Sequence, residues 1–167
     1  LDVRAPSVIN VDDKFGRQLV ASVSRPVTYA LDAQADVRPD RIELSDNGMV
    51  LDVRTPRGTL SLRSRLLGRS NAYNIVAAAA IGTALTLPFR AIERGLASVE
   101  RVPGRMELVS HLSDDVRVIV DFAHTDDAMK GLLEAARELT TGRLITVFGC
   151  GGDRDRGKRP LMGRVAA

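Results

Sequence analysis

The residues best suited to chemistry form a glycine-rich loop near the end of the chain. Residues 149–159 read Gly-Cys-Gly-Gly-Asp-Arg-Asp-Arg-Gly-Lys-Arg and follow an apolar run. Open α/β sheets bind ligands at such strand ends, where glycine lets the backbone approach and cations attract an anion. A Walker A loop needs Ser or Thr where Arg159 stands, and Asp155 and Arg156 break the dinucleotide fingerprint. The loop is therefore either another kind of anion site or a structural turn.

An aspartate and a histidine follow a second apolar run. Residues 116–120 predict a continuous buried strand, and Asp121 and His124 come directly after it, before a helix that Thr125 can cap. Side chains at the carboxyl end of such a strand face the ligand crevice of an α/β sheet. In the structural alternative, Asp121 caps a turn and His124 is a half-buried side chain with satisfied hydrogen bonds.

Two amides stand three positions apart at the start of an alanine-rich segment. Asn71 and Asn74 would be neighbours on the first turn of a buried helix over residues 72–85. An amide both donates and accepts, so such a pair can read the edge of a base. The structural alternative is simple helix capping by Ser70 or Asn71.

The segment before these amides has the alternation of strands. Short strands are predicted at residues 8–11 and 27–30. Residues 41–65 alternate polar and apolar side chains, with breaks at Asp46-Asn47-Gly48 and Pro56-Arg57-Gly58. This pattern predicts three antiparallel strands joined by two hairpins, since Asn-Gly supplies the positive φ values of a tight turn.

A second helix and a break in the helical pattern follow. Pro88 suits the first turn of an amphipathic helix, whose inner face would carry Phe89, Ile92, Leu96 and Val99. Val102-Pro103-Gly104-Arg105 then interrupts the pattern and predicts a domain boundary. The chain should thus comprise two pieces, residues 1–101 and 102–167.

The second piece predicts the opening of a parallel α/β sheet. Its expected elements are strands at residues 106–111, 116–120 and 144–148, a helix between Thr125 and Gly142, and a helix from about Pro160.

Composition limits the classes of function. The chain has 167 residues, a net charge of +3 spread along its length and 4% aromatic residues, which argues against a nucleic-acid partner. One cysteine and two histidines are too few for a disulfide or a closed zinc site. The longest apolar stretch, residues 75–87, is too short to span a membrane, and no signal peptide is evident. A cytoplasmic protein is expected, and both ends of the chain read as cut.

Taken together, the segments resemble the Mur ligase family over nearly the whole chain. The loop at residues 148–160 is the most specific element and is typical of UDP-N-acetylmuramoyl-tripeptide synthetases. The other matching segments are Asn10-Val11-Asp12-Asp13, Gly68 to Asn74, Val102 to Glu107 and Asp121-Phe122-Ala123-His124-Thr125. There are departures at Ser70, where the family often has a bulkier residue, and at Phe122, where it usually has Tyr. The resemblance implies an α/β fold, with the end of a central ATPase domain followed by the start of a Rossmann-like domain.

The resemblance also implies the residues of a nucleotide site. Asn71 and Asn74 would lie on the adenine side of ATP, with Asn74 in direct contact. Arg105 and Asp121 would complete the site from the linker and the carboxy-terminal domain, with His124 beside them. No residue of the chain is assigned a catalytic role or a role as metal ligand.

The reaction implied is amide-bond formation in peptidoglycan synthesis. ATP with Mg²⁺ would phosphorylate the D-glutamate carboxylate of UDP-N-acetylmuramoyl-L-alanyl-D-glutamate, and the amine of meso-diaminopimelate or L-lysine would attack the acyl phosphate. Arg154 would pair with the carboxylate of that amino acid. The phosphate loop would precede this chain, so the fragment alone should not ligate, and the full-length enzyme should act as a monomer.

Other interpretations stay open. A folylpolyglutamate-type ligase shares the linker arginine and the Asp-His segment, although a different glycine-rich loop is expected there. The chain could also be a non-catalytic α/β module that binds an anion in the loop at residues 149–157. Half of an NAD-dependent dehydrogenase would need an acidic residue about 20 positions after that loop.

Overall fold

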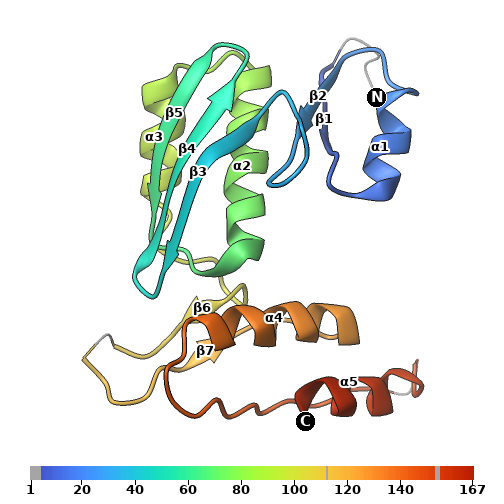
Figure 1. Ribbon diagram of the computed structural model, residues 1–167, viewed down its shortest axis with the longest axis vertical. Coiled ribbons are helices and arrows are strands. Elements are labelled where there is room, and N and C mark those ends of the chain that lie inside the picture. The colour runs from blue at the N-terminus through green and yellow to red at the C-terminus, as the bar shows by residue number, and fades with distance from the viewer. Residues whose placement is uncertain (1–4, 112, 153–154) are drawn as a thin grey trace. The chain divides into compact units, whose positions relative to one another are not determined.

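The chain divides into two compact units. The computed structural model describes residues 5–111, 113–152 and 155–167, so the predicted ligand residue Arg154 lies outside the described residues. One unit comprises Leu1–Arg101 and the other Val102–Ala167, each with its own helices and strands (Figure 1).

The first unit begins with a small parallel pair of strands and a connecting helix. β1 (Ser7–Asn10) pairs with β2 (Pro26–Tyr29), and α1 (Lys14–Val20) lies between them in the sequence. Asp13 caps α1 because its carboxylate accepts two backbone N–H groups of the first turn. A Cβ at Gly16 would lie 1.7 Å from the carbonyl oxygen at the end of β1, so glycine is required for this close approach. Both strands confirm the sequence prediction.

A three-stranded antiparallel sheet forms the centre of the same unit. Its strands are β3 (Arg38–Ser45), β4 (Gly48–Thr55) and β5 (Gly58–Ser64), in that order. Ser45 pairs with Gly48, and Thr55 pairs with Gly58, so both hairpins are tight. The predicted strands and hairpins are confirmed. The turn geometry differs from expectation, because positive φ occurs at Gly48 and not at Asn47.

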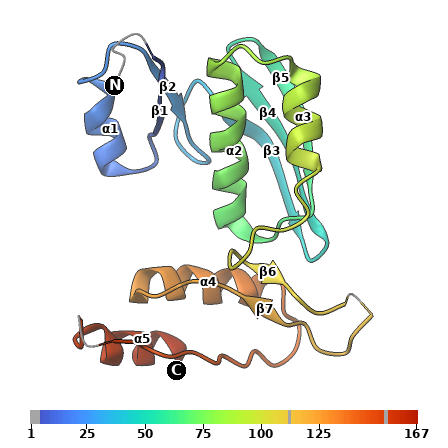
Figure 2. The ribbon, with the colours of Figure 1, turned by 180° about the vertical axis from the view of Figure 1, so that it is seen from behind.

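Two helices cover one face of this sheet (Figures 1 and 2). They are α2 (Gly68–Ala84) and α3 (Phe89–Ala97). The core lies between sheet and helices, where the fully buried side chains are Leu51, Val53, Leu60 and Leu62 from the sheet and Ala72, Val76, Ala79 and Ala80 from α2. Alternate residues of β4 and β5 point inward, as the period of a half-buried strand requires.

The start of α2 corrects one prediction. The helix begins at Gly68 and its N-cap is Leu67, which makes no side-chain capping bond, so neither Ser70 nor Asn71 is the cap. The physical reason is that the Asn71 amide donates to the backbone oxygen of Leu67, which commits the side chain to the helix itself. Pro88 stands at the N-cap of α3 rather than within its first turn.

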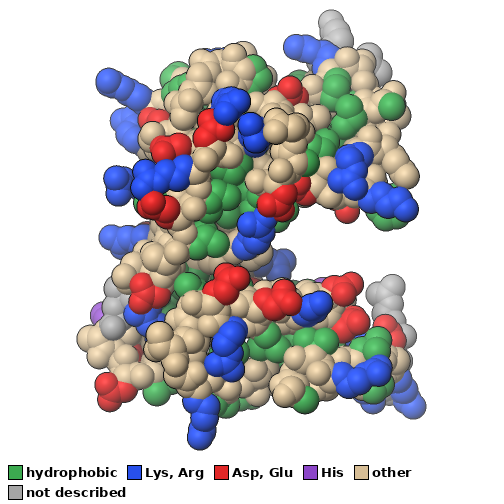
Figure 3. All heavy atoms as spheres, in the orientation of Figure 1, with side chains coloured by type: hydrophobic (Ala, Val, Ile, Leu, Met, Phe, Trp, Pro, Cys, Tyr) green, Lys and Arg blue, Asp and Glu red, His purple; other side chains and the backbone are tan. Residues whose placement is uncertain are grey.

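The described residues of the second unit form two short strands and two helices. They are β6 (Glu107–Leu108), β7 (Ile119–Val120), α4 (Asp126–Glu138) and α5 (Lys158–Ala166). Thr125 caps α4, with Asp126 and Asp127 in its first turn, as the sequence predicts. α4 packs against α5, and the buried side chains include Met129 and Met162. On the face shown in Figure 3, acidic and basic side chains are intermixed.

The strands expected in the second unit are only partly formed. β6 and β7 pair antiparallel and are shorter than the predicted strands at residues 106–111 and 116–120. Residues 144–148 form no strand, and Ile145 and Val147 are 67% and 94% exposed. An extended segment is held by hydrogen bonds to a neighbouring strand, and in the described part of this unit residues 144–148 have no such neighbour. The α/β class is confirmed. The predicted strand at residues 116–120 forms only at Ile119–Val120 and is not buried, and the one at residues 144–148 does not form. The prediction of a parallel sheet is wrong for the described residues of this unit, because β6 and β7 pair antiparallel.

Candidate functional site

The two amides of the first unit lie together on the first turns of α2. The Asn71 side chain is fully buried, and its Nδ2 donates to the Leu67 oxygen over 2.9 Å. Its Oδ1 accepts a bond from Nδ2 of Asn74 over 3.2 Å. Asn74 itself is exposed. Asn71 therefore holds the turn and orients Asn74, which is the amide that faces solvent.

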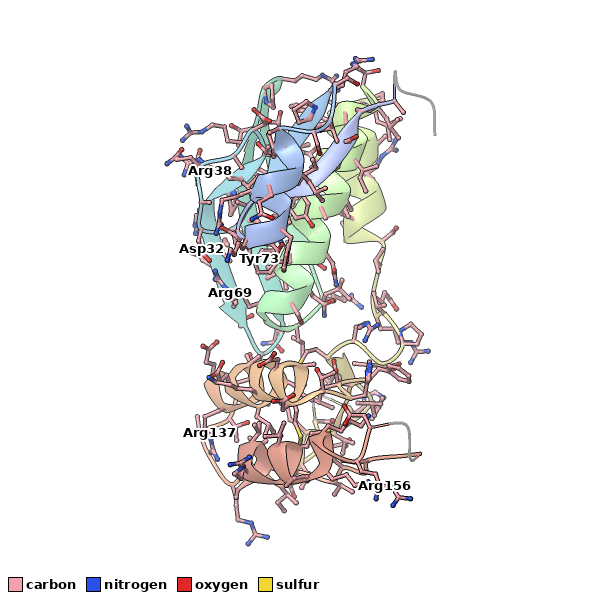
Figure 4. All side chains as sticks on the ribbon, turned by 90° about the vertical axis from the view of Figure 1, so that its right-hand side faces the viewer. Asp32, Arg38, Arg69, Tyr73, Arg137 and Arg156 are labelled. Carbon is pink, nitrogen blue, oxygen red and sulfur yellow. The ribbon has the colours of Figure 1, made fainter. Side chains whose placement is uncertain are left out.

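A polar cluster beside these amides was not predicted from the sequence. The Asp12 carboxylate accepts the hydroxyl of Tyr73 over 2.9 Å and the backbone N–H groups of Leu31, Asp32 and Ala33 over 2.6, 3.2 and 2.8 Å. Arg69 donates from Nη2 to both carboxylate oxygens of Asp32, each over 2.6 Å. The Arg69 guanidinium also lies 5.9 Å from the ring centroid of Tyr73. Asp32, Arg69 and Tyr73 lie close together in Figure 4.

Burial and the hydrogen bonds of this cluster shift the pKa values of Asp12 and Tyr73. Burial opposes ionisation of Asp12, but the backbone N–H groups of residues 31–33 and the Tyr73 hydroxyl together lower its pKa below the ordinary 3.8. Burial and the bond to Asp12 raise the pKa of Tyr73 to about 12. At neutral pH the carboxylate is ionised and the phenol is protonated, which are the states that this hydrogen bond needs.

The predicted linker residues of the second unit are also neighbours. Asp121 Oδ2 accepts the backbone N–H of Met106 over 2.8 Å, and Oδ1 accepts that of Ala123 over 2.8 Å. The Arg105 guanidinium lies 5.9 Å from the ring centroid of Phe122. Both oxygens of Asp121 thus bind backbone, so this residue ties the linker to the end of β7 and thereby places Arg105.

His124 differs from the half-buried histidine of the structural alternative. It is exposed, its ring packs edge-on against Phe122 at 5.6 Å, and Nδ1 lies 3.2 Å from the Phe122 oxygen. Because a carbonyl oxygen only accepts, this contact places the proton on Nδ1 and leaves Nε2 as the acceptor in the neutral ring.

The glycine-rich loop is joined to the same segment. Lys158 donates from Nζ to the His124 oxygen over 3.2 Å, and Arg159 donates from Nη2 to the Gly152 oxygen over 2.9 Å. Asp155 Oδ1 accepts the N–H groups of Gly157 and Lys158. Arg159, the residue that excluded a Walker A loop, therefore closes this loop, and Lys158 connects it to the turn after β7.

The described residues offer no evident metal site. Within residues 5–111, 113–152 and 155–167, no group of three His, Cys, Asp or Glu side chains could hold a metal ion. The helices in the described part of the chain also include none long and apolar enough to cross a membrane.

Comparison with known proteins defines the class. Residues 2–82 match the Mur ligase middle domain, and residues 104–167 match the Mur ligase glutamate ligase domain. Since these two matches together cover most of the chain, the chain belongs to the Mur ligase family.

The relatives carry a more particular name. The chain is 49% identical over 164 residues to the UDP-N-acetylmuramoyl-L-alanyl-D-glutamate–2,6-diaminopimelate ligase of Geobacter metallireducens, covering 98% of the chain and 32% of that protein. The ligase of the same name from Bacillus velezensis is 41% identical and is matched over 96% of the chain and 33% of its own length. The chain spans about a third of the length of these relatives.

Solved structures agree at the level of the fold. A structure of UDP-N-acetylmuramoyl-L-alanyl-D-glutamate–2,6-diaminopimelate ligase has a TM-score of 0.66 and 33% identity, over 96% of this chain and 34% of that one. Folylpolyglutamate synthetase from Lactobacillus casei has a TM-score of 0.65 at 22% identity, over 82% and 36% of the two chains. At that identity the second likeness concerns the fold alone.

Proposed function

We propose that this chain is part of an ATP-dependent ligase that adds meso-diaminopimelate to UDP-N-acetylmuramoyl-L-alanyl-D-glutamate in peptidoglycan synthesis. The observation that carries the proposal is the 49% identity to a ligase of that name over 98% of the chain. This also favours diaminopimelate over lysine as the amino acid. The proposal includes a cytoplasmic, monomeric full-length enzyme.

The two units would have separate parts in this ligase. Residues 1–101 would belong to the central ATP-binding domain, and residues 102–167 would be the linker and the start of the carboxy-terminal domain. This assignment is supported by the family matches at residues 2–82 and 104–167. The chain would therefore carry nucleotide contacts in both units and the amino-acid contact in the second.

The geometry supports distinct roles within the nucleotide site. Asn74 would contact adenine, because its amide is exposed, while buried Asn71 orients it. Arg105 would meet the phosphates, and Asp121 would hold it there through the linker backbone. His124 would lie beside them, with Nε2 available to accept a bond in the neutral ring.

The proposed chemistry proceeds through an acyl phosphate. In the first step, an oxygen of the D-glutamate carboxylate attacks the γ-phosphorus of ATP, and ADP leaves. In the second step, the amine of diaminopimelate attacks the acyl carbon and loses a proton, and phosphate leaves as the amide forms. Phosphoryl transfer depends mainly on positioning and on neutralising charge, to which Mg²⁺ would contribute. Arg154 would bind the amino acid's carboxylate. The residues that flank it in the loop are held by the bonds from Lys158 to the His124 oxygen and from Arg159 to the Gly152 oxygen.

The test uses the full-length protein that contains this chain. Arg154→Ala should raise the KM for diaminopimelate roughly tenfold or more and leave the KM for ATP nearly unchanged, because a charge-assisted carboxylate bond is lost. Asn74→Ala should instead raise the KM for ATP and leave the KM for diaminopimelate nearly unchanged. Exposed Arg143, in the same unit as Arg154, provides a matched control as Arg143→Ala. An unchanged KM for diaminopimelate in Arg154→Ala, or phosphate release that does not depend on diaminopimelate, would contradict the proposal.

A further inference from the structure

Asp12 connects three segments that are distant in the sequence. It follows β1, its carboxylate binds the backbone of residues 31–33, and it accepts the hydroxyl of Tyr73 in α2. Oδ2 accepts from Leu31, Asp32 and Tyr73, and Oδ1 accepts from Ala33, so both oxygens of the carboxylate bind groups of the protein itself.

The segment that Asp12 holds reaches α2 a second time. Asp32, within residues 31–33, forms an ion pair with Arg69, and the Arg69 guanidinium lies near the face of the Tyr73 ring. The contacts thus run from Asp12 to Tyr73, from Tyr73 to Arg69 and from Arg69 to Asp32, whose backbone N–H returns to Asp12. Figure 4 labels Asp32, Arg69 and Tyr73. Both Arg69 and Tyr73 belong to the first turns of α2.

The position of these contacts on α2 matters for the amides. Tyr73 is the residue before Asn74, and Arg69 lies two residues before Asn71. The beginning of α2 has no side-chain cap and no acidic residue in its first turn. Contacts from outside the helix therefore help to fix its rotation and axial position there, and the carboxylates of Asp12 and Asp32 supply the charged ones.

We propose that Asp12 is a positioning residue for nucleotide binding, which sets the Asn74 amide by fixing the first turns of α2 through Tyr73 and the Asp32–Arg69 pair. The inference rests on the proposed function, because it needs Asn74 to contact adenine. Loss of the Asp12 contact should shift or loosen the amide and weaken ATP binding without touching the amino-acid site.

The experiment compares Asp12→Asn, Tyr73→Phe and the double variant in the full-length protein. An amide keeps one acceptor oxygen, so Asp12→Asn should raise the KM for ATP about fivefold or more, with the KM for diaminopimelate within about twofold of the parent. Tyr73→Phe keeps the ring beneath Arg69 and removes one bond, so a smaller rise is expected. The double variant should be no worse than Asp12→Asn, since the two residues act through the same bond.

Controls separate this role from a general loss of folding. Asp40→Asn removes another carboxylate of the same unit, which pairs with Arg54 on the sheet, and should leave the KM for ATP unchanged. If Asp12→Asn lowers the thermal midpoint but not ATP affinity, the inference is overturned, and if that variant does not fold, Tyr73→Phe decides in the same way. The KM for ATP of Asn74→Ala is measured in parallel. If that KM is unchanged, the proposed function is overturned. If it rises in Asn74→Ala but not in Asp12→Asn or Tyr73→Phe, only this inference is overturned.

Discussion

Val53 in the alternating strand β4 and Val147 in the apolar run at residues 144–148 are the same residue type, and both were predicted to lie in strands. Val53 is 0% exposed and Val147 is 94% exposed. β4 has a paired strand on each side and α2 against one face, while residues 144–148 have no strand partner in the described part of their unit. An apolar pattern therefore indicates that a segment can be buried, and the neighbouring strands and helices determine whether it is.

The buried residues of the two units differ in kind as well. In residues 1–101 they are mainly branched aliphatic side chains and alanines from a sheet and a helix. In the described part of residues 102–167 the buried hydrophobic side chains are Met106, Met129, Ala136 and Met162. Methionine is flexible and fills irregular gaps, so a core of this kind tolerates substitution better than the interdigitated aliphatic core of the sheet.

The largest difference between the two units is expected in how alanine substitution of a glycine changes the free energy of unfolding. A Cβ at Gly48, where φ is 130°, would lie 2.1 Å from the Ser64 oxygen, so Gly48→Ala should lower the free energy of unfolding by about 3 kcal/mol through strain and overlap. A Cβ at Gly131 in α4 meets nothing within 4 Å, and Gly131→Ala should instead raise it by about 0.5–1 kcal/mol. Urea unfolding of the 167-residue chain measures both. Equal losses would show that α4 is as tightly enclosed as the hairpin.

A matched pair of valines tests the comparison directly. Val53→Ala removes buried methyl groups and should lower the free energy of unfolding by about 2–3 kcal/mol, whereas Val147→Ala should change it by about 0.5 kcal/mol or less. The denaturant midpoints of the two variants at an unchanged m-value provide the measurement. A large loss in Val147→Ala would mean that residues 144–148 are buried in solution.

A pH dependence that arises in the first unit should be smaller than the losses expected at Gly48 and Val53. Asp12→Asn should lower the free energy of unfolding by about 1 kcal/mol at neutral pH, since hydrogen bonds to a charged acceptor are lost. Because folding lowers the pKa of Asp12 below 3.8, this contribution is present above pH 3.8 and disappears as the pH falls through the folded value. Unfolding curves of parent and variant should converge in acid. If the two free energies of unfolding still differ well below pH 3.8, the loss in Asp12→Asn comes from packing rather than from the charge.

Features encoded by neighbouring residues were predictable from the sequence. The Thr125 cap of α4, the two hairpins and the inward alternation of β4 and β5 depend on contacts within a few residues or on side-chain periodicity. The pairing of Asn71 with Asn74 followed from helical spacing. The α2 cap was predicted wrongly, because the Asn71 side chain bonds within the helix instead.

Features that join distant segments were missed. The bond between Asp12 and Tyr73 spans 61 residues, and nothing in the neighbourhood of either residue indicates the other. The link from Lys158 to the His124 oxygen spans 34 residues and is equally hidden. Such contacts arise only when the chain has folded, so a sequence pattern could indicate candidate residues for the site but not the bonds that orient them.

The sequence by itself determined the α/β class and the order of most elements, because periodicity, caps and turns are local properties. The family followed from the resemblance of its motifs to those of known proteins. The sequence also determined which residue types are available for the proposed contacts with a nucleotide and an amino acid. The tertiary structure decided that Asn71 is buried and Asn74 exposed, and that Asp121 is committed to the linker backbone. It also decided that the apolar run at residues 144–148 stays exposed, because burial and hydrogen bonding are properties of neighbours in space.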